Sequence, residues 1–188
     1  MARIVSAFVA LVMGVLFMTD QAQALDPENT LYLDTKNGRV IIEMRPDVAP
    51  KHVARIKALT RAGFYDGLTF HRVIDGFMAQ TGDPKGNGTG GYTDASGMEQ
   101  YLPAEFSMEP FKRGAVGMAR AQDINSASSQ FFIMFAPAPH LNGQYTVWGY
   151  VTEGMDVVDK INHGKDRRGN IDPDPDTIVK MQVAADAK

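Results

Sequence analysis

Short runs of alternating hydrophobic and polar residues recur along most of the chain, and the first two lie close together. Residues 31–35 (Leu-Tyr-Leu-Asp-Thr) and 39–44 (Arg-Val-Ile-Ile-Glu-Met) are rich in the β-branched and aromatic side chains that favour strands. Lys36-Asn37-Gly38 stands between them, and Asn-Gly is a strong signal for a tight hairpin turn. The pattern therefore predicts a β-hairpin at this point.

A helical period replaces this alternation over residues 49–60 and predicts a helix. Gly63 follows as the residue that would end it. The small, apolar or uncharged side chains share one face and the basic ones point away from it: Ala49, Val53, Ile56 and Thr60 on the first, and Lys51, Arg55 and Lys57 on the second. A second, shorter helix is predicted over residues 155–161, with Gly164 after it.

The rest of the pattern predicts strands and one long loop. Residues 69–83 form two strands around Asp75-Gly76, residues 84–97 are glycine-rich loop, and further strands cover 115–119, 130–135, 146–152 and 177–183. No repeat or linker divides residues 25–188, so one domain is predicted. About eight short strands with only two helices favour a mainly β fold, a closed antiparallel β-barrel capped by two α-helices.

The first 24 residues are predicted to be a signal peptide and not part of the fold. Arg3 precedes an apolar run over residues 4–18, and Ala22-Gln23-Ala24 forms a small-x-small cleavage pattern. A transmembrane anchor is the alternative, but this run is shorter than the ~20 residues that a spanning helix needs. We therefore expect a mature chain from Leu25, exported to the periplasm and not inserted in the membrane after cleavage.

Composition excludes several classes of function. Hydrophobic residues make up 44% and charged residues 22% of the 188 positions, a globular balance, and the net charge is −3. Sustained nucleic-acid binding normally requires a basic face, so no nucleic-acid partner is expected. The chain has no cysteine, which excludes disulfides, thiolate nucleophiles and cysteine zinc sites.

Two other motifs are weak candidates for ligand sites. The run from Gly86 to Gly91 is glycine-rich but lacks the Gly-Lys-Ser/Thr ending of a phosphate-binding loop, so a flexible loop is favoured. Asp172, Asp174 and Asp176 alternate like calcium ligands, yet two prolines and the lack of a final Glu favour a solvated acidic turn. We predict no metal and no cofactor.

Arg72 is the residue whose position demands an explanation. Period-two alternation places it on the strand face opposite His71 and Val73. An arginine between apolar residues is expensive to bury, so a surface charge or an ion pair with Asp75 or Glu43 would be the ordinary interpretation.

Four ordered blocks of sequence resemble one known family. Residues 70–83 read Phe-His-Arg-Val-Ile-Asp-Gly-Phe-Met-Ala-Gln-Thr-Gly-Asp and closely resemble the cyclophilin signature Phe-His-Arg-x-Ile-x-Gly-Phe-Met-x-Gln-x-Gly-Asp. Gly88-Thr89-Gly90-Gly91, Gly117-Met118-Ala119-Arg120 and Ser129-Gln130-Phe131-Phe132-Ile133 match in order, and residues 141–151 look like the bacterial form. The resemblance covers a core from about residue 31 to 183.

The resemblance implies an eight-stranded barrel with a helix at each end and an active site on its outer surface. It assigns catalysis to Arg72 and Gln80, and it implies a peptidyl-prolyl cis-trans isomerase that acts on proline-containing polypeptide segments. The remaining site residues fall into three groups: a proline pocket of Phe77, Met78, Phe132 and Leu141; Gln130 with Gln80 on the peptide backbone; and Ala119 with the main chain of Arg120 along the substrate strand.

Three positions depart from the best-known eukaryotic cyclophilins, and all three are expected to contact substrate or inhibitor. His140 stands where those proteins have a tryptophan that supports cyclosporin binding, Tyr145 replaces a common histidine, and Arg120 replaces a common asparagine. The resulting hypothesis is a monomeric isomerase that assists the folding of exported proteins. The alternative is a module that binds proline-containing segments, or a chaperone, with little turnover.

Overall fold

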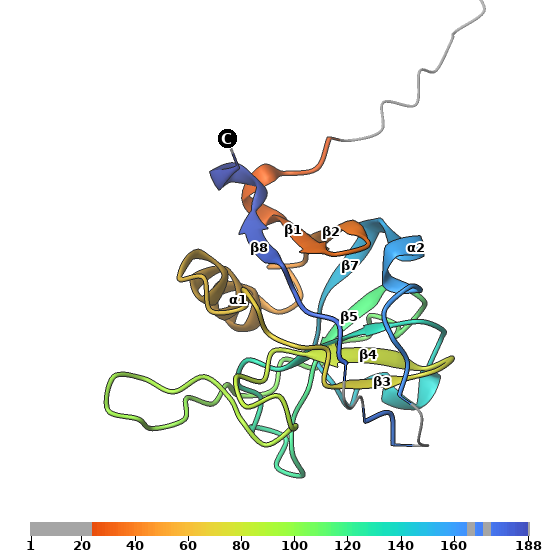
Figure 1. Ribbon diagram of the computed structural model, residues 1–188. Coiled ribbons are helices and arrows are strands. Elements are labelled where there is room, and N and C mark those ends of the chain that lie inside the picture. The colour runs from red at the N-terminus through yellow and green to blue at the C-terminus, as the bar shows by residue number, and fades with distance from the viewer. Residues whose placement is uncertain (1–23, 165–167, 171–173, 188) are drawn as a thin grey trace, which may run out of the picture.

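The computed structural model describes residues 24–164, 168–170 and 174–187 of the chain. Eight strands form one antiparallel sheet in the order β3-β4-β6-β5-β7-β2-β1-β8 (Figure 1). Their bounds are β1 Thr30–Thr35, β2 Gly38–Met44, β3 Arg72–Ile74, β4 Met78–Thr81, β5 Ala115–Met118, β6 Phe131–Met134, β7 Val147–Glu153 and β8 Lys180–Val183. The predicted mainly β, eight-stranded fold is confirmed.

The predicted hairpin forms between β1 and β2, with Thr35 opposite Gly38 at the turn. Alternate side chains of both strands are fully buried: Leu31, Leu33, Val40 and Ile42. The two-residue period of the sequence therefore corresponds to one face of the sheet turned toward the core.

The two edge strands of the sheet, β3 and β8, are joined through the short segments that precede them. Among the described residues, Gly67 N donates to Ile178 O at 2.7 Å, Ile178 N to Leu68 O at 2.9 Å, and Phe70 N to Asp176 O at 2.8 Å. In the part of the chain that the structure describes, no continuous strand pairing joins β3 itself to β8. The strand predicted over residues 177–183 is shorter than expected, because only Lys180–Val183 form a ladder with β1, whereas residues 177 and 178 make isolated contacts with the segment before β3.

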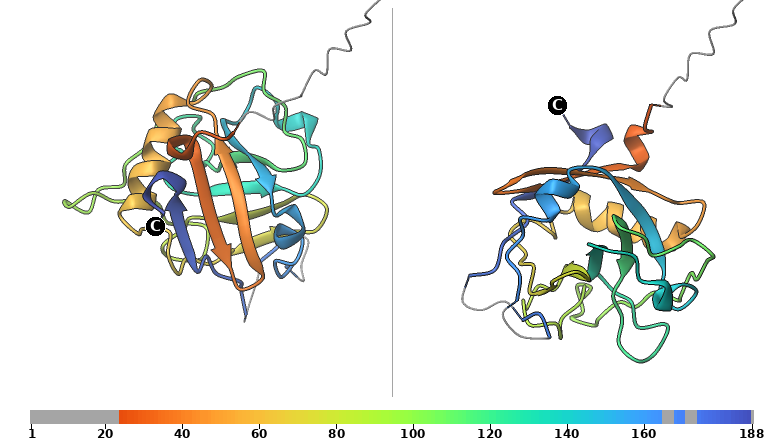
Figure 2. Two further views of the ribbon diagram at one scale, coloured as in Figure 1. Left: turned by 90° about the horizontal axis from the view of Figure 1, so that it is seen from above. Right: turned by 90° about the vertical axis from the view of Figure 1, so that its right-hand side faces the viewer.

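The two predicted helices lie at opposite ends of the molecule, α1 at the left and α2 at the right of Figure 1 (see also Figure 2), and both pack against the same core cluster. Helix α1, Pro50–Arg61, buries Val53, Ile56 and Leu59 against the core inside the sheet. Helix α2, Met155–Val158, is a single turn, shorter than the predicted 155–161. Three 3₁₀ turns complete the elements: η1 Pro27–Asn29, η2 Pro139–Leu141 and η3 Ala184–Asp186.

Two hydrophobic clusters share the sheet. The larger one fills the interior between the sheet and α1, and Trp148, Phe131 and Tyr65 are among its fully buried side chains. The smaller one lies on the other face of β4, β5 and β6 and contains Met78, Phe111, Phe132, Met134 and Leu141. This second cluster is the foundation of the site described below.

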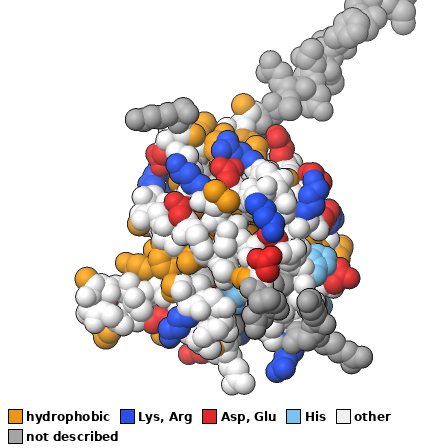
Figure 3. Space-filling model, viewed as in Figure 1, with side chains coloured by type: hydrophobic (Ala, Val, Ile, Leu, Met, Phe, Trp, Pro, Cys, Tyr) orange, Lys and Arg blue, Asp and Glu red, His pale blue; other side chains and the backbone are white. Residues whose placement is uncertain are grey.

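A projecting loop and a mixed surface charge characterise the outside of the molecule. Residues 92–101 extend from the body next to the sheet (Figure 1), with Met98 and Tyr101 exposed. On the face drawn in Figure 3, basic and acidic side chains are interspersed, and hydrophobic side chains gather where this loop leaves the body.

The acidic run near the C-terminus differs from its prediction. Asp172 lies outside the described residues, and Asp174 is exposed, but Asp176 is 2% exposed. Its Oδ1 pairs with Lys36 Nζ at 2.6 Å, and its Oδ2 accepts Asn162 N at 2.7 Å. The prediction of a solvated turn is therefore wrong for Asp176, which links two distant segments. No metal-binding group of His, Asp or Glu occurs among the described residues.

The predicted signal peptide lies outside the described residues, apart from Ala24. Within the described ranges, no helix is both long and apolar enough to span a bilayer.

Candidate active site

A row of directly paired residues crosses four strands and carries the predicted chemistry. Arg72 on β3 pairs with Gln80 on β4, Gln80 with Phe132 on β6, and Phe132 with Gly117 on β5. Residues directly opposite one another in antiparallel strands point to the same face of the sheet. The strand pairing therefore brings Arg72, Gln80 and Phe132 together on one face, although up to 60 positions separate them in sequence.

The neighbours of this row point the other way. His71, Val73, Ala79 and Phe131 are buried, with exposed fractions of 6% for His71 and 0% for the other three. Burial holds the pKa of His71 below its ordinary value of 6.5. The alternation predicted around Arg72 is confirmed, and His71 is a packed histidine of the interior.

A pocket of about 190 Å³ opens beside the row. It is lined by every predicted site residue except Gln130 and His140: Arg72, Phe77, Met78, Gln80, Ala119, Arg120, Phe132, Leu141 and Tyr145. Phe132 rests on Phe111, whose ring stacks at a centroid distance of 5.7 Å. A Cβ at Gly117 would lie 2.7 Å from Phe132 Cζ, so only glycine leaves room for these rings.

The Arg72 guanidinium is held at the rim of this pocket by two hydrogen bonds. Its Nε donates to Arg168 O at 3.0 Å, and its Nη1 donates to Gln80 Oε1 at 3.1 Å. Burial lowers the pKa of Arg72 from its ordinary value, although arginine stays charged in proteins. The ion pair with Asp75 or Glu43, which was one form of the ordinary interpretation, does not occur within the described residues.

Two glutamines continue this contact away from the pocket. Gln80 Nε2 donates to Gln130 Oε1 at 2.8 Å, and Gln130 Nε2 donates to Gly90 O at 2.7 Å and Gly88 O at 3.2 Å. Gln130 therefore contacts Gln80, a residue of the pocket lining, without lining the pocket itself.

A second hollow of about 250 Å³ adjoins the first and shares Gln80, Ala119 and Arg120 with it. Its other walls come from the glycine loop, the base of the projecting loop and residues 121–130: Gly88, Thr89, Gly90, Glu99, Tyr101, Ala121, Ser126, Ser128 and Gln130. Sequence reasoning missed most of these residues. The sequence did single out the Gly88–Gly91 block, but as part of the family resemblance and not as part of the wall of this hollow.

Arg120 and Tyr145 form one unit at the edge of the pocket. The Arg120 guanidinium lies over the Tyr145 ring, 4.5 Å from its centroid, and donates to Ala121 O and Gln144 O at 2.8 and 3.0 Å. The Arg120 guanidinium is thus occupied by the carbonyls of Ala121 and Gln144. The predicted contact of Arg120 with substrate would therefore use its main chain.

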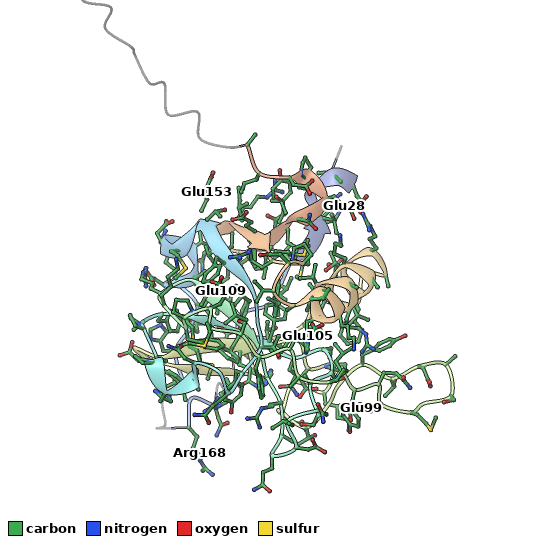
Figure 4. The ribbon with its side chains drawn as sticks, turned by 180° about the vertical axis from the view of Figure 1, so that it is seen from behind. Glu28, Glu99, Glu105, Glu109, Glu153 and Arg168 are labelled. Atoms are coloured by element: carbon green, nitrogen blue, oxygen red, sulfur yellow. The ribbon has the colours of Figure 1, made fainter. Side chains whose placement is uncertain are left out.

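His140 lies beside the pocket and not in its lining. Its ring stacks on Phe77 at a centroid distance of 5.9 Å and an interplanar angle of 25°, and its side chain is exposed. A contact that the sequence did not predict comes from Arg168, whose carbonyl binds Arg72. Arg168 lies at the edge of the molecule far from Glu28 and Glu153 (Figure 4).

Comparisons with known proteins agree with this geometry. Residues 30–183 match the family model described as "Cyclophilin type peptidyl-prolyl cis-trans isomerase/CLD". A probable peptidyl-prolyl cis-trans isomerase of Brucella suis is 56% identical over 97% of this chain and 95% of its own length. Peptidyl-prolyl cis-trans isomerase B of Bacillus subtilis is 41% identical over 71% of this chain and 90% of its own length.

Solved structures lead to the same conclusion. A cyclophilin from Hirschia baltica superposes with a TM-score of 0.75 at 28% identity, over 87% of this chain and 77% of that protein. A cyclophilin-type isomerase of Cryptosporidium parvum, solved in the presence of the dipeptide Ala-Pro, gives 0.72 at 29% identity, over 82% and 98%. Sequence, fold and site geometry together place this chain in the family of cyclophilin-type peptidyl-prolyl cis-trans isomerases.

Proposed function

We propose that this isomerase is exported to the periplasm, assists the folding of exported proteins there, and uses Arg72 to accelerate rotation about X-Pro bonds. The single observation that carries the catalytic part is the placement of the Arg72 guanidinium. Gln80 and the Arg168 carbonyl hold it at the rim of an apolar pocket, and no carboxylate pairs with it within the described residues.

The chemistry follows from the electronic structure of the amide. Rotation about a peptide bond costs ~18–20 kcal/mol because the twisted state loses amide resonance. In that state the proline nitrogen regains its lone pair and becomes a hydrogen-bond acceptor. A charged donor aimed at this nitrogen binds the twisted state better than either planar state, which lowers the barrier. No nucleophile or general base is needed, and no metal or cofactor enters the proposal.

The orientation of Arg72 suits this role. Nε and Nη1 are occupied by Arg168 O and Gln80 Oε1, and Nη2 has no hydrogen-bond partner among the described residues. Two anchored nitrogens fix the plane of the guanidinium, since the group is rigid. The third is left to meet a substrate whose proline ring fills the pocket of Phe77, Met78, Phe132 and Leu141.

The substrates in this proposal are proline-containing polypeptide segments. The Cryptosporidium parvum isomerase was solved in the presence of Ala-Pro, which supports a proline-containing substrate for this chain. The second hollow gives such a segment room to continue beyond the proline, because the two hollows share Gln80, Ala119 and Arg120. We further propose that the enzyme acts as a monomer and binds no nucleic acid.

Export rests on the sequence alone. The apolar run over residues 4–18 and the pattern Ala22-Gln23-Ala24 precede Leu25, and the family match begins at residue 30. Removal of the first 24 residues would thus leave the matched domain intact.

Substitution of Arg72 tests the catalytic proposal. Arg72→Ala should lose ~10²–10³ in kcat/KM in a protease-coupled or exchange-based isomerisation assay, and Arg72→Lys should recover part of it. Arg39→Ala is the matched control, since Arg39 pairs with Asp34 on the far hairpin at 2.7 Å. Near-wild-type turnover in a folded Arg72→Ala protein would show that the assigned role is wrong. Weak turnover in the wild type would favour the binding-module alternative.

A further inference from the structure

A buried carboxylate, Asp83, lines neither of the two hollows and takes no part in the proposed reaction. It stands two residues after the end of β4 and is 1% exposed. No Lys or Arg pairs with it within the described ranges. A buried charge without a counter-ion is costly unless hydrogen bonds satisfy it fully.

Backbone amides of the glycine loop satisfy this carboxylate. Oδ1 accepts Lys85 N at 2.7 Å, and Oδ2 accepts Asn87 N at 3.0 Å and Gly88 N at 2.6 Å. Although burial alone would raise the pKa of Asp83, these amide donors hold it below its ordinary value. The carboxylate therefore stays ionised near neutral pH and fixes the course of residues 85–88.

The loop that Asp83 shapes also presents two carbonyls to the site. Gly88 O and Gly90 O accept the two hydrogen bonds from Gln130 Nε2. A Cβ at Gly90 would overlap Asp83 Oδ1, so the carboxylate and the loop are in close contact at this point as well. Any displacement of the loop moves the acceptors of Gln130.

A continuous chain of contacts then leads to the guanidinium. Gln130 Oε1 accepts Gln80 Nε2 at 2.8 Å, and Gln80 Oε1 accepts Arg72 Nη1 at 3.1 Å. Each amide has its orientation fixed by its neighbour, because the oxygen and the NH₂ of a glutamine play opposite roles. The loop carbonyls thus determine which end of Gln80 faces Arg72.

We propose that Asp83 is a positioning residue for Arg72: its carboxylate organises the loop of residues 85–90, whose carbonyls orient Gln130, then Gln80, then the guanidinium. This inference rests on the proposed role of Arg72. It explains why a fully buried charge stands immediately behind a groove that it does not line.

Asp83→Asn removes the charge and replaces one acceptor oxygen with an NH₂ that repels the loop amides. We expect kcat to fall by about 10- to 100-fold, since small misplacements of a catalytic group have effects of this order. KM should change by less than about threefold, because the apolar pocket is untouched. Asp176→Asn is the matched control. The Asp176 carboxylate is also buried and also accepts a backbone amide, but it takes no part in the hydrogen bonds that lead from the loop to Arg72, so kcat should be unchanged.

A double-mutant cycle separates positioning from a general loss of stability. If Asp83 acts through Gln130, the effect of Asp83→Asn on kcat should shrink to about twofold or less in a Gln130→Ala background. The side-chain amide signals of Gln80 and Gln130 in ¹H–¹⁵N spectra should move in Asp83→Asn and stay in place in Asp176→Asn. Additive effects in the cycle, or unmoved amide signals, would overturn the inference.

If Asp83→Asn does not fold, Gly90→Ala provides the test, because it keeps the carboxylate and displaces the loop; unchanged kcat in that folded variant overturns the inference. The two proposals fail separately. An active, folded Arg72→Ala protein refutes the role of Arg72, whereas an inactive Arg72→Ala protein beside a fully active Asp83→Asn protein refutes only the role of Asp83.

Discussion

At the scale of single residues, the site is built from side chains that each have one contact beyond the pocket. Phe132 lies in the pocket and rests on Phe111 at 5.7 Å, and Phe77 faces the pocket and stacks on His140 at 5.9 Å. Aromatic pairs of this kind contribute about 0.5–1.5 kcal/mol beyond the area they bury. The apolar surface of the pocket is therefore supported by aromatic packing in the absence of a ligand.

The stack between Phe77 and His140 leads to a prediction for inhibitor binding. A tryptophan at position 140 would add a large apolar face and a directed N–H donor, and such anchors are typically worth ≥2 kcal/mol, more than tenfold in affinity. We expect cyclosporin to inhibit the wild type weakly and His140→Trp at least tenfold better, with kcat/KM affected less. His163→Trp, beside Asp75, is the control in the same inhibition curves. Low-nanomolar inhibition of the wild type, or no gain in His140→Trp, would contradict this.

At the scale of elements, helix α1 depends on a residue 53 positions away for its first turn. Its N-cap is Ala49, whose side chain makes no capping hydrogen bond. Glu105 supplies the missing acceptors: its carboxylate oxygens accept Lys51 N at 3.1 Å and His52 N at 3.0 Å. The same carboxylate binds His52 Nδ1 at 2.7 Å. A loop thus fixes the helix to the sheet.

Removal of this cap should destabilise the whole fold. Glu105→Ala leaves two helix amides and the buried His52 Nδ1 without their acceptor. A lost cap costs typically ~1 kcal/mol and an unsatisfied buried donor ~1–3 kcal/mol, so the free energy of unfolding should fall by about 2–4 kcal/mol. Urea unfolding followed by circular dichroism measures this. Glu153→Ala, at an exposed site, should be within about 0.5 kcal/mol of wild type; equal losses in both variants would disprove the capping role.

At the scale of the whole molecule, two buried histidines couple stability to pH. Burial holds the pKa of His52 and His71 below 6.5, despite the opposing influence of Glu105 on His52 and Asp83 on His71. As the pH falls below about 6.5, the unfolded chain gains protons that the folded chain does not bind. The contribution of the two neutral histidines to the free energy of unfolding is therefore fully present above this pH and decreases as the pH falls toward the lower pKa values of the folded state.

Urea unfolding between pH 7.5 and pH 5 should show this dependence. We expect the free energy of unfolding to decrease as the pH is lowered. The decrease between pH 7.5 and pH 5 should be smaller in His52→Gln than in the wild type. A flat profile in the wild type, or an unchanged slope in a His52→Gln, His71→Gln double variant, would contradict the assignment to these histidines.

Export also concerns the whole chain. We expect the protein recovered from the periplasm to begin at Leu25, since Ala22 and Ala24 supply the small side chains that cleavage requires. N-terminal sequencing tests this directly, and Ala24→Leu should block processing and leave a longer form. Recovery of exported protein that still begins at Met1 or Ala2 would disprove the prediction.

The sequence by itself determined the periodic parts of this protein. Alternation predicted the hairpin and the outward direction of Arg72, the helical period predicted the buried face of α1, and the signature block identified residues that meet at one pocket. These features are local: strand and helix periods decide which side chains share a face before any long-range contact forms. Strand boundaries are not encoded in this local pattern, because a strand extends only as far as a neighbouring strand runs beside it: β1 pairs with Lys180–Val183, whereas Thr177 forms an isolated bridge with Thr69.

Only the tertiary structure decided how the loops complete the site. The Arg168 carbonyl on Arg72, the Gly88 and Gly90 carbonyls on Gln130, and the Asn162 amide on the buried Asp176 each join segments that are distant in the chain. Backbone carbonyls and amides are the same in every residue, so a contact made through them leaves no mark in the sequence. Side chains predicted the pocket, whereas the backbone contacts that hold its arginine in place appear only once the chain has folded.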